Sequence, residues 1–323
     1  MERATGAAGV AGAAEAEAAG ERATRAYAEH RELLFSLVYN LLGSVADTED
    51  VLQDTWLAWT ARATDPAAPG IEHPKAYLVR IAVNRALAQQ AAAVRRRETY
   101  VGPWLPEPLV GPLLGADGGT DGGTGDVALA AERAESVSLA LLVVLETLSP
   151  LERTAFVLHE VFGYSGAEVA AVLGRSPAAV RQLVKRARAH VQERRPRYEA
   201  EPAVRRQVTE RFLAAALGGD LKALLELLAP DVTLIGDGGG KAPGGRRPLT
   251  GRTKVARLLA ALAGKSGDRG LEVTWRSVNG APAAAFSAFG RPFAVLVLDL
   301  APEGDLVRGI HAVSNPDKLR GVA

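Results

Sequence analysis

The sequence has no cysteine and only five histidines among its 323 residues. Without cysteine, the chain has no disulfides, no thiolate zinc sites and no cysteine nucleophile. The histidines are scattered without metal-ligand spacing, so we expect neither a metal nor a cofactor. No apolar run approaches the roughly 20 residues that span a bilayer, and the N-terminus lacks the apolar core of a signal peptide. These absences predict a cytoplasmic protein that does not associate with a membrane.

Charge is nearly balanced overall, with 38 basic and 37 acidic residues, so the net charge of +1 does not by itself indicate a nucleic-acid partner. The distribution is more informative. Residues 1–60 contain ten Asp or Glu residues against four Arg. Residues 175–197, in contrast, contain eight Arg or Lys residues and a single acid, Glu193. Such segregation suits a protein that contacts phosphate with one face and another protein with the rest of its surface.

Proline- and glycine-rich breaks divide the chain into several parts, as its length also suggests. The N-terminal stretch is rich in Ala, Gly and Glu and is predicted to be disordered. The expected organisation is a disordered tail at 1–24, a helical domain at 25–100, a Pro/Gly-rich linker at 101–126, a second helical domain at 127–197 and a C-terminal domain at 203–323.

Apolar spacing in the first helical domain predicts three helices. Leucines and valines from Leu33 to Leu42 recur at helical spacing, and Gly43 ends that helix. Asp47 is a plausible N-cap for a second helix. Pro74 lies at the start of a third, which extends to Arg97.

The second helical domain has the pattern of a helix-turn-helix. A helix is predicted over 139–148, and Ser149 with Pro150 starts the next. A short helix over 166–173, a Gly174 turn and a basic helix over 177–191 follow. In this motif the second helix enters the major groove with its N-terminal residues facing bases. The candidate base contacts are Ser176, Ala178, Ala179, Arg181 and Gln182, and the candidate phosphate contacts are Lys185, Arg186 and Arg188. The alternative is that this basic helix is only a solvated face.

Three strings in this order resemble extracytoplasmic-function (ECF) sigma factors that contain only regions 2 and 4. They are ADTEDVLQDTW at 46–56, PKAYLVRIAVNR at 74–85, and LSPLER at 148–153 followed by YSGAEVA at 164–170. The resemblance covers roughly residues 25–195. It implies two all-α sigma domains, a region 2 helical bundle and a region 4 helix-turn-helix.

The resemblance also implies partners. Such factors bind core RNA polymerase, mainly the β′ clamp and also the β subunit, and direct it to the −10 and −35 elements of promoter DNA. The implied polymerase-binding residues are Asp47, Glu49, Asp50, Gln53 and Asp54. The implied −10 contacts are Lys75, Arg80, Asn84 and Arg85. Tyr77 is equally compatible with a core position, and some of the acids with simple solvation of their helix.

The C-terminal domain is predicted to be α+β. Two amphipathic helices come first, and runs at 230–234, 272–276, 283–289, 293–300 and 307–313 favour strands, expected to form an antiparallel sheet. This order resembles the cone-shaped, SnoaL-like branch of the nuclear transport factor 2-like fold. The complete chain is therefore expected to be a multidomain protein with two helical domains and a cone.

Three short motifs resemble those of the SigJ-like group of ECF factors, which carry this extension. The motifs are Trp104, Leu105, Pro106, Glu107, Pro108 and Leu109 (WLPEPL); Asp237, Gly238, Gly239, Gly240, Lys241 and Ala242 (DGGGKA); and Asn315, Pro316, Asp317, Lys318 and Leu319 (NPDKL). In this group the extension restrains and supports the sigma domains in place of a separate anti-sigma factor. We expect an intramolecular contact in which the linker lies across the DGGGKA loop. The alternatives are an ordinary loop between strands and an N-capped last turn.

Two other functions are open for the C-terminal domain. An isomerase- or cyclase-type enzyme would need His311 with an acid such as Asp231, Asp237 or Asp299. A small-molecule sensor would need an apolar pocket, which Trp275, Phe286, Phe289 and Phe293 could line or simply fill. The sequence has no nucleophile, metal set or phosphate loop to support catalysis, so no enzyme activity is predicted.

Overall fold

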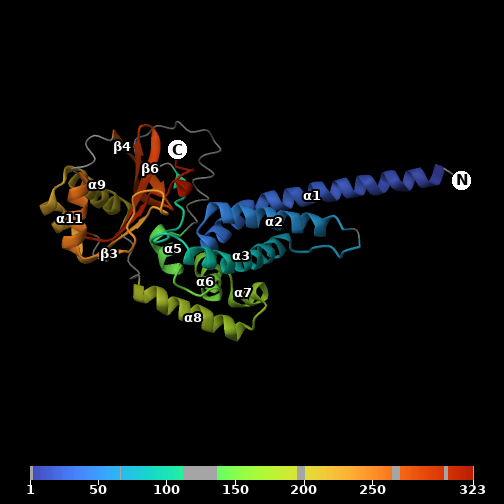
Figure 1. The fold of residues 1–323 in the computed structure, drawn as a ribbon. Coiled ribbons are helices and arrows are strands. Elements are labelled where there is room, and N and C mark those ends of the chain that lie inside the picture. Colours follow the sequence, from blue (N-terminus) through green and yellow to red (C-terminus); the bar gives the residue numbers. More distant parts are fainter. Residues whose placement is uncertain are drawn as a thin grey trace. The chain divides into compact units, whose positions relative to one another are not determined.

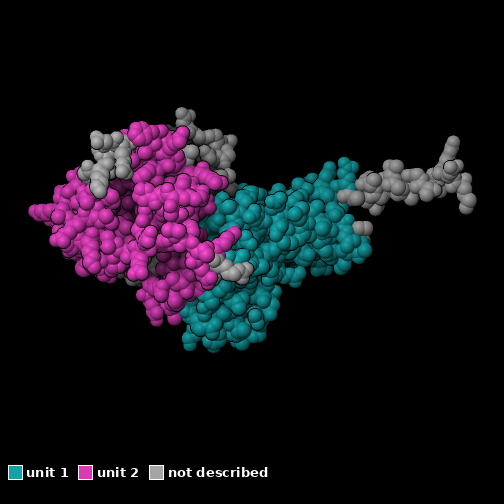
Figure 2. All heavy atoms as spheres, in the orientation of Figure 1, with its two compact units in different colours: residues 1–93, 149–187 teal, residues 94–148, 188–323 magenta. Residues whose placement is uncertain are grey.

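The computed structural model describes residues 3–65, 67–111, 137–194, 201–263, 270–301 and 305–322. Figure 2 colours the chain by its two compact units. Unit 1 comprises Met1–Ala93 and Ser149–Ala187, and unit 2 comprises Val94–Leu148 and Arg188–Ala323. Each unit is therefore assembled from two stretches that are far apart in the sequence.

Unit 1 begins with long helices (Figure 1), namely α1 (Arg3–Leu42), α2 (Val45–Ala63) and most of α3 (Pro74–Glu98). Their apolar positions recur at helical spacing, so each helix buries one stripe. The buried side chains include Leu34, Leu37, Val38, Leu41, Leu52, Leu78, Val79, Ala82 and Val83. Gly43, with φ of +68°, ends α1 as predicted, since a left-handed residue stops a helix at low cost only when it is glycine.

Two helix starts differ from the sequence prediction. Ser44, not Asp47, caps α2: its backbone is extended and its hydroxyl accepts the N–H of Asp47. Asp47 then lies in the first turn, where a carboxylate is stabilised by the positive end of the helix. The second difference is α1, which is helical from Arg3, whereas a disordered tail was predicted for 1–24. Alanine, the strongest helix former, is abundant in this stretch and offsets its glycines.

The second stretch of unit 1 contains the helix-turn-helix. Its elements are α6 (Pro150–Phe156), the π-helical η1 (Val157–Val161), α7 (Gly166–Leu173) and α8 (Pro177–Arg194), whose last turns belong to unit 2. Ser149 and Ser165 each form a capping box with the glutamate three residues later. Gly174, with φ of +61°, ends α7 and turns the chain into α8. The predicted Ser-Pro start and glycine turn are thus both present.

Unit 2 contains the C-terminal α+β domain, residues 202–322, which we call the cone, together with β1 (Val110–Gly111) and α5 (Leu139–Leu145) from the middle of the chain. The elements of the cone are α9 (Pro202–Gly218), α10 (Leu221–Leu227), β2 (Leu228–Asp237), β3 (Leu249–Thr250), α11 (Arg252–Ala263), β4 (Leu271–Val278), β5 (Ala281–Ala288), β6 (Arg291–Leu300), β7 (Val307–Val313) and the 3-10 helix η2 (Pro316–Lys318). The sheet order is β1-β4-β5-β6-β7-β2-β3. The part of the predicted linker after Gly111 lies outside the described residues up to Val137.

The sheet is mixed, which corrects the expectation of an antiparallel sheet. β4, β5, β6 and β7 form an antiparallel meander, but β2 pairs with β7 in parallel. A parallel pair needs a long crossover, and here the chain between β2 and β7 provides it, through α11 and the meander. A pattern of strand-like runs contains no information about this pairing.

The two faces of the sheet bury different partners, because successive side chains of a strand point to opposite faces. The helix face packs against α9, α10 and α11, with Phe212, Leu224 and Val255 in its core. The linker face packs against residues from the linker, α5 and the chain after β7. We call residues 100–111 the docked linker; its buried or half-buried contributions to this face are Leu105 and Val110.

Candidate functional site

The acidic residues of α2 form one exposed face. Glu49, Asp50, Gln53 and Asp54 are all exposed, and Leu57 continues the same face with 58% of its surface exposed. Residues at i, i+3, i+4 and i+7 lie on one side of a helix. An exposed leucine beside acids is a suitable interface anchor, and sequence analysis missed it although its spacing from Asp50 was readable.

Two of these acids already have partners within unit 1. The guanidinium of Arg31 donates to Glu49 at 2.9 Å, and that of Arg85 donates to Asp54 at 2.9 Å. Asp47 is half-buried in the first turn, near the side-chain amide of Gln89. The structure thus brings together Asp54 and Arg85, which were predicted for different partners.

The −10 candidates lie along α3. Lys75, Arg80 and Asn84 are exposed, and Arg80 and Asn84 are one turn apart on the same side. Tyr77 is half-buried: its ring centroid is 6.0 Å from that of Trp59 and 5.4 Å from the Arg80 guanidinium. Tyr77 therefore packs against the helical core while one side remains accessible.

The −35 candidates occupy α8 and its preceding turn. Ser176, Ala178, Arg181, Gln182 and the three downstream basic residues are exposed, and Ala179 is half-buried. The Ser176 hydroxyl accepts the N–H of Ala179 at 3.2 Å, so it caps the helix. Arg186 donates to Glu152 at 2.7 Å. This contact and the hydroxyl of Ser149 lower the pKa of Glu152, with the Ser149 hydrogen bond the larger cause.

Three basic residues of α8 share one face. Arg181, Lys185 and Arg188 are spaced at i, i+4 and i+7, so they form a stripe along the helix. Arg186 does not belong to this series and donates to Glu152 instead. Of the predicted phosphate contacts, the structure therefore places two on the stripe and one against α6.

A buried arginine, absent from the predictions, links the two stretches of unit 1. Arg153 in α6 is 4% exposed, and its Nε donates to the carbonyl of Asn40 in α1 at 3.0 Å. Burial lowers the pKa of the Arg153 guanidinium. The LSPLER string contains this residue, but no local pattern indicates that its charge is buried.

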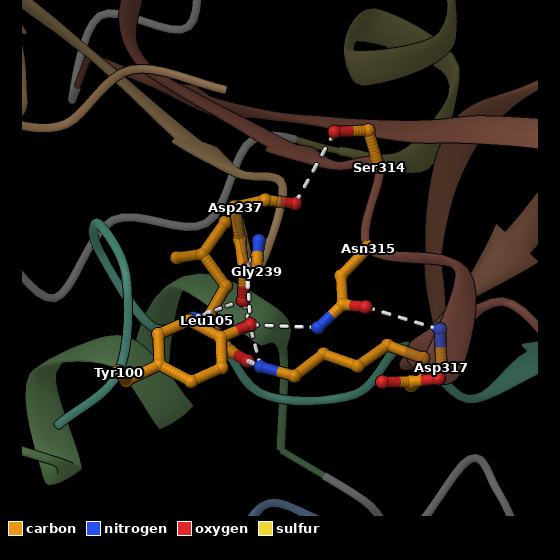
Figure 3. A network of polar contacts seen from close by, with 8 residues as sticks. Tyr100, Leu105, Asp237, Gly239, Ser314, Asn315 and Asp317 are labelled. Carbon is orange, nitrogen blue, oxygen red and sulfur yellow. Dashed lines mark hydrogen bonds and ion pairs between the residues drawn. The ribbon is translucent and has the colours of Figure 1, made fainter. Parts of the chain in front are cut away.

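The polar centre of unit 2 is the carboxylate of Asp237, at the end of β2 (Figure 3). Asp237 is fully buried. One oxygen accepts the hydroxyl of Tyr100 at 2.6 Å and the N–H of Gly239 at 3.1 Å. The other accepts the N–H of Leu105 at 2.8 Å and the Lys318 ammonium at 2.7 Å. Four donors satisfy this buried charge, as such a group requires.

Lys318 connects the third motif to the same centre. Besides Asp237, its ammonium donates to the carbonyl of Leu105 and lies 4.1 Å from the ring centroid of Trp104. Burial lowers the pKa of Lys318 to about 8, although Asp237 opposes the shift. Both backbone groups of Leu105 are therefore bound by the cone.

The start of the docked linker is held partly through Tyr100 and Arg97, which sequence analysis missed. The amide of Asn315 donates to the Tyr100 hydroxyl at 2.7 Å. Burial and the hydrogen bond to Asp237 raise the pKa of Tyr100 well above its usual value. The Arg97 guanidinium lies 3.6 Å from the Trp104 ring centroid and forms an ion pair with Glu146. Trp104 is thus close to two cations.

The glycines of the DGGGKA loop are needed for this close approach. Gly239 has φ of +59°, and a Cβ there would lie 2.4 Å from Nδ2 of Asn315 and 3.0 Å from the Tyr100 hydroxyl. A side chain at this position would therefore displace both partners. The loop is shaped around the linker and the NPDKL motif.

The residues of the three motifs differ in how deeply they are buried. In WLPEPL, Leu105, Pro106, Pro108 and Leu109 are buried, whereas Trp104 and Glu107 are half-buried. In the other two motifs, Asp237, Gly238, Asn315, Lys318 and Leu319 are buried; Gly239 and Ala242 are half-buried; and Gly240, Lys241, Pro316 and Asp317 are exposed. Lys241 and Asp317 form an exposed ion pair at 2.5 Å.

The docked linker ends as an edge strand of the cone sheet. β1 pairs antiparallel with β4. Just before it, the N–H of Leu109 donates to the Asn279 side chain at 3.2 Å, and the N–H of Asn279 donates to the carbonyl of Leu109 at 2.9 Å. Backbone pairing of this kind extends a sheet by one strand.

The residues proposed for an enzyme and those proposed for a sensor lie mainly on different faces of the sheet. Of the acids proposed as partners of His311, Asp299 lies beside it, since both side chains flank Gly309. His311 pairs with Val297 in the sheet, so it lies on the linker face, whereas Trp275 and Phe286 pack on the helix face. Asp299 is bound by Arg308 and Asp237 by Lys318, while Asp231 is exposed. Phe289 is 81% exposed in a turn, and Phe293 is half-buried.

Within the described ranges, no group of three or more His, Asp or Glu side chains is arranged to hold a metal ion. In the same part of the chain, no helix is long and apolar enough to cross a membrane.

Comparison with known proteins supports the resemblance over nearly the whole chain. Residues 26–97 match the family described as Sigma-70 region 2, and residues 138–191 match Sigma-70, region 4. The ECF RNA polymerase sigma factor SigJ of Mycobacterium tuberculosis is 36% identical over 299 residues, which cover 90% of this chain and 91% of the relative. A probable ECF sigma factor, SigI, of the same species is 32% identical over 64% of this chain and 67% of its own length.

A solved structure agrees with the sequence relatives. The crystal structure of M. tuberculosis SigJ matches with a TM-score of 0.69 at 36% identity, covering 90% of this chain and 96% of that chain. The architecture is two helical sigma regions followed by an α+β domain, as predicted. The chain belongs to the ECF family of RNA polymerase sigma factors and is SigJ-like.

Proposed function

We propose that this protein is a promoter-specificity subunit that binds core RNA polymerase and directs it to −10 and −35 elements to start transcription. One observation carries this conclusion: regions 2 and 4 occur in order within a chain that is 36% identical to SigJ over 90% of its length. Such a subunit works in the cytoplasm and needs no cofactor. It is not an enzyme, and we expect no turnover by its cone.

We assign core-polymerase binding to the acidic face of α2. Asp50, Gln53 and Asp54 are exposed on one side of the helix together with Leu57. An apolar anchor surrounded by charges gives both affinity and register. By the sigma-factor resemblance, the β′ clamp and the β subunit are the proposed partners.

We assign the −10 element to α3. Arg80 and Asn84 are exposed one turn apart, and Lys75 lies exposed in the first turn. Arginine and lysine suit the phosphates of a single strand, and an amide suits a base edge. Arg85 is a proposed contact too, but it must first leave Asp54, to which it donates at 2.9 Å.

We assign the −35 element to α8. Ala178 and Gln182 are exposed near its N-terminus, where a recognition helix faces bases, and small residues allow close approach. The stripe of Arg181, Lys185 and Arg188 is proposed to contact phosphates. The hydroxyl of Ser176 is used as a cap, so its role is to start the helix.

We further propose that the cone regulates sigma activity by holding the linker between regions 2 and 4. The support is the set of hydrogen bonds and ion pairs among Tyr100, Leu105, Asp237 and Lys318. A linker whose backbone is bound by the cone is not free to be bound by polymerase. Release of the linker is then a required step of activation.

The test is run-off transcription with core RNA polymerase on a promoter found by genome-wide binding. The full chain is compared with a chain cut after Arg205 and with one cut before Asn315, which lacks the NPDKL motif. Promoter-dependent product from at least one of the three supports the sigma function, and no product from any would overturn it. An altered yield from the chain cut before Asn315 supports regulation through the linker, whereas unchanged yield would exclude it.

A further inference from the structure

A second basic region occurs in the cone, apart from α8. Residues 238–267 contain seven arginines and lysines and no acid. Five of these side chains are exposed. Lys241 pairs with Asp317, and the other four are Arg246 and Arg247 in the loop before β3 and Lys254 and Arg257 on α11. We call these four residues the cone basic segment.

The charges of the cone basic segment are not neutralised locally. Among the described residues, none of the four forms an ion pair, in contrast to Lys241, which pairs with Asp317. One exposed acid, Asp231, lies on β2 two residues before Thr233, which pairs with Thr250. Uncompensated basic residues within about a Debye length of one another make a surface that attracts anions.

The sheet places this segment close to the end of α8 within unit 2. Arg308 of β7 donates to the carbonyl of Arg194, in the last turn of α8, at 3.2 Å. The next residue, Gly309, pairs with Thr233 of β2, which in turn pairs with Thr250 of β3. Two strand spacings separate Gly309 from Thr250, about 10 Å. α11 starts two residues after Thr250.

The short stretch of chain between α8 and α9 also keeps the cone near the end of α8. α8 ends at Arg194 and α9 begins at Pro202, so seven residues join them and span at most about 25 Å. A connection of this length allows the cone to reach a duplex on which α8 lies. A DNA strand offers a regular series of phosphates that such a basic surface fits.

We propose that the cone basic segment binds the phosphate backbone of duplex DNA beside the −35 element, as a second contact that is independent of sequence. The proposal rests on the proposed function, because it takes α8 to lie on promoter DNA. In this arrangement α8 reads the sequence, and the cone adds affinity and salt dependence.

The experiment uses the full chain and a fluorescent duplex of about 40 base pairs and arbitrary sequence, with binding followed by anisotropy over a salt series from about 50 mM upward. The test variant is Arg247→Gln with Lys254→Gln and Arg257→Gln. The matched control is Arg211→Gln with Lys222→Gln and Arg291→Gln, which removes the same number of exposed charges of the same kinds elsewhere on the cone. Because both variants have the same net charge, a difference between them reports where on the cone the charges were lost.

We expect the test variant to bind about tenfold more weakly, with a salt slope smaller by about 2–3, because each lost phosphate contact lowers the slope by about 0.9. The control should bind almost like the unmodified chain. Equal loss in both variants, no loss in the test variant, or no binding by the unmodified chain at about 50 mM salt would each overturn the proposal. So would unchanged duplex binding with weaker binding to core polymerase, which would make the segment a polymerase contact.

A third variant, Arg181→Gln with Lys185→Gln, separates this proposal from the proposed function. If it weakens duplex binding and the cone variant does not, the cone proposal fails and the −35 assignment stands. If both variants bind like the unmodified chain, both assignments fail. All substituted side chains are exposed, so circular dichroism should show unchanged folding, and Lys254→Gln alone provides a milder test in the same direction.

Discussion

The two faces of the cone sheet are held in different ways. The helix face buries a continuous apolar cluster, in which Phe212 and Leu224 are fully buried. The linker face has a smaller apolar cluster around Leu105 and, next to it, the buried pair of Asp237 and Lys318. Apolar contact is tolerant of exact geometry, whereas a buried charge pair is stable only when every donor and acceptor is matched.

We therefore expect the helix face to stay packed, whereas the linker can leave the linker face under the proposed regulation. A buried ion pair contributes little net free energy of folding, since the cost of desolvation offsets most of its attraction. It nevertheless strongly disfavours any state in which one partner stays buried alone. We therefore expect the docked linker to be specific in position but only moderately stable, as the proposed regulation requires.

The largest expected effect is that of Asp237→Ala. Loss of this carboxylate leaves Lys318 buried without its partner and removes the acceptor for Tyr100 and Leu105, which should cost docking about 3–5 kcal/mol. Hydrogen exchange should then accelerate at least about a hundredfold in residues 100–111. Asp317→Asn, which breaks only an exposed pair, is the control and should change docking by less than about 1 kcal/mol. Equal acceleration in both variants would refute the central role of Asp237.

A matched pair of leucines compares the faces directly. Leu105 and Leu224 are both 0% exposed, one on each face. Either change to alanine should cost about 2–5 kcal/mol, but the cost should appear in different measurements. Leu224→Ala should lower the denaturant midpoint of the cone. Leu105→Ala should speed exchange in the docked linker and leave that midpoint nearly unchanged; a large drop would show that both faces form one core.

A further expected effect, spread over a range of pH, is a pH dependence of docking. Burial lowers the pKa of Lys318 to about 8, against an unshifted value of 10.5. Between these values the undocked state binds more protons than the docked state, so docking should strengthen as pH rises from about 8 toward 10. The slope should flatten in Lys318→Arg, which does not titrate in this range. Hydrogen exchange in residues 100–111, corrected for the intrinsic effect of pH on exchange, measures the strength of docking. Docking that weakens between about pH 8 and 10 would contradict the lowered pKa of Lys318.

Tyr100 sets the upper end of the pH range over which docking strengthens. Its pKa is raised in the docked state, so above about pH 10 the undocked state loses the tyrosine proton first. Docking should therefore weaken again at higher pH. The two residues together predict strongest docking near pH 10, with the rise due to Lys318 and the fall due to Tyr100.

The sequence predicted the elements whose signals are local. Ser149 with Pro150 and the Gly174 turn located the helix-turn-helix, because caps and left-handed turns depend on a few adjacent residues. The motifs predicted that the linker lies across the DGGGKA loop, but not how: Tyr100 and Arg97 contribute as much as the motif residues and belong to no pattern. The parallel pairing of β2 with β7 and the burial of Arg153 depend on contacts distant in sequence, which local spacing does not encode.

The bond from Lys318 to the carbonyl of Leu105 joins residues 213 positions apart in one chain. A separate inhibitor dissociates on dilution, and its effect depends on how much of it the cell makes. Here the cone and the linker that it binds are always present in equal amounts, and the tether sets an effective concentration that dilution does not alter. Under the proposed regulation, a polymerase that takes the linker must compete with that local concentration, so the threshold for activation would be set by the chain itself.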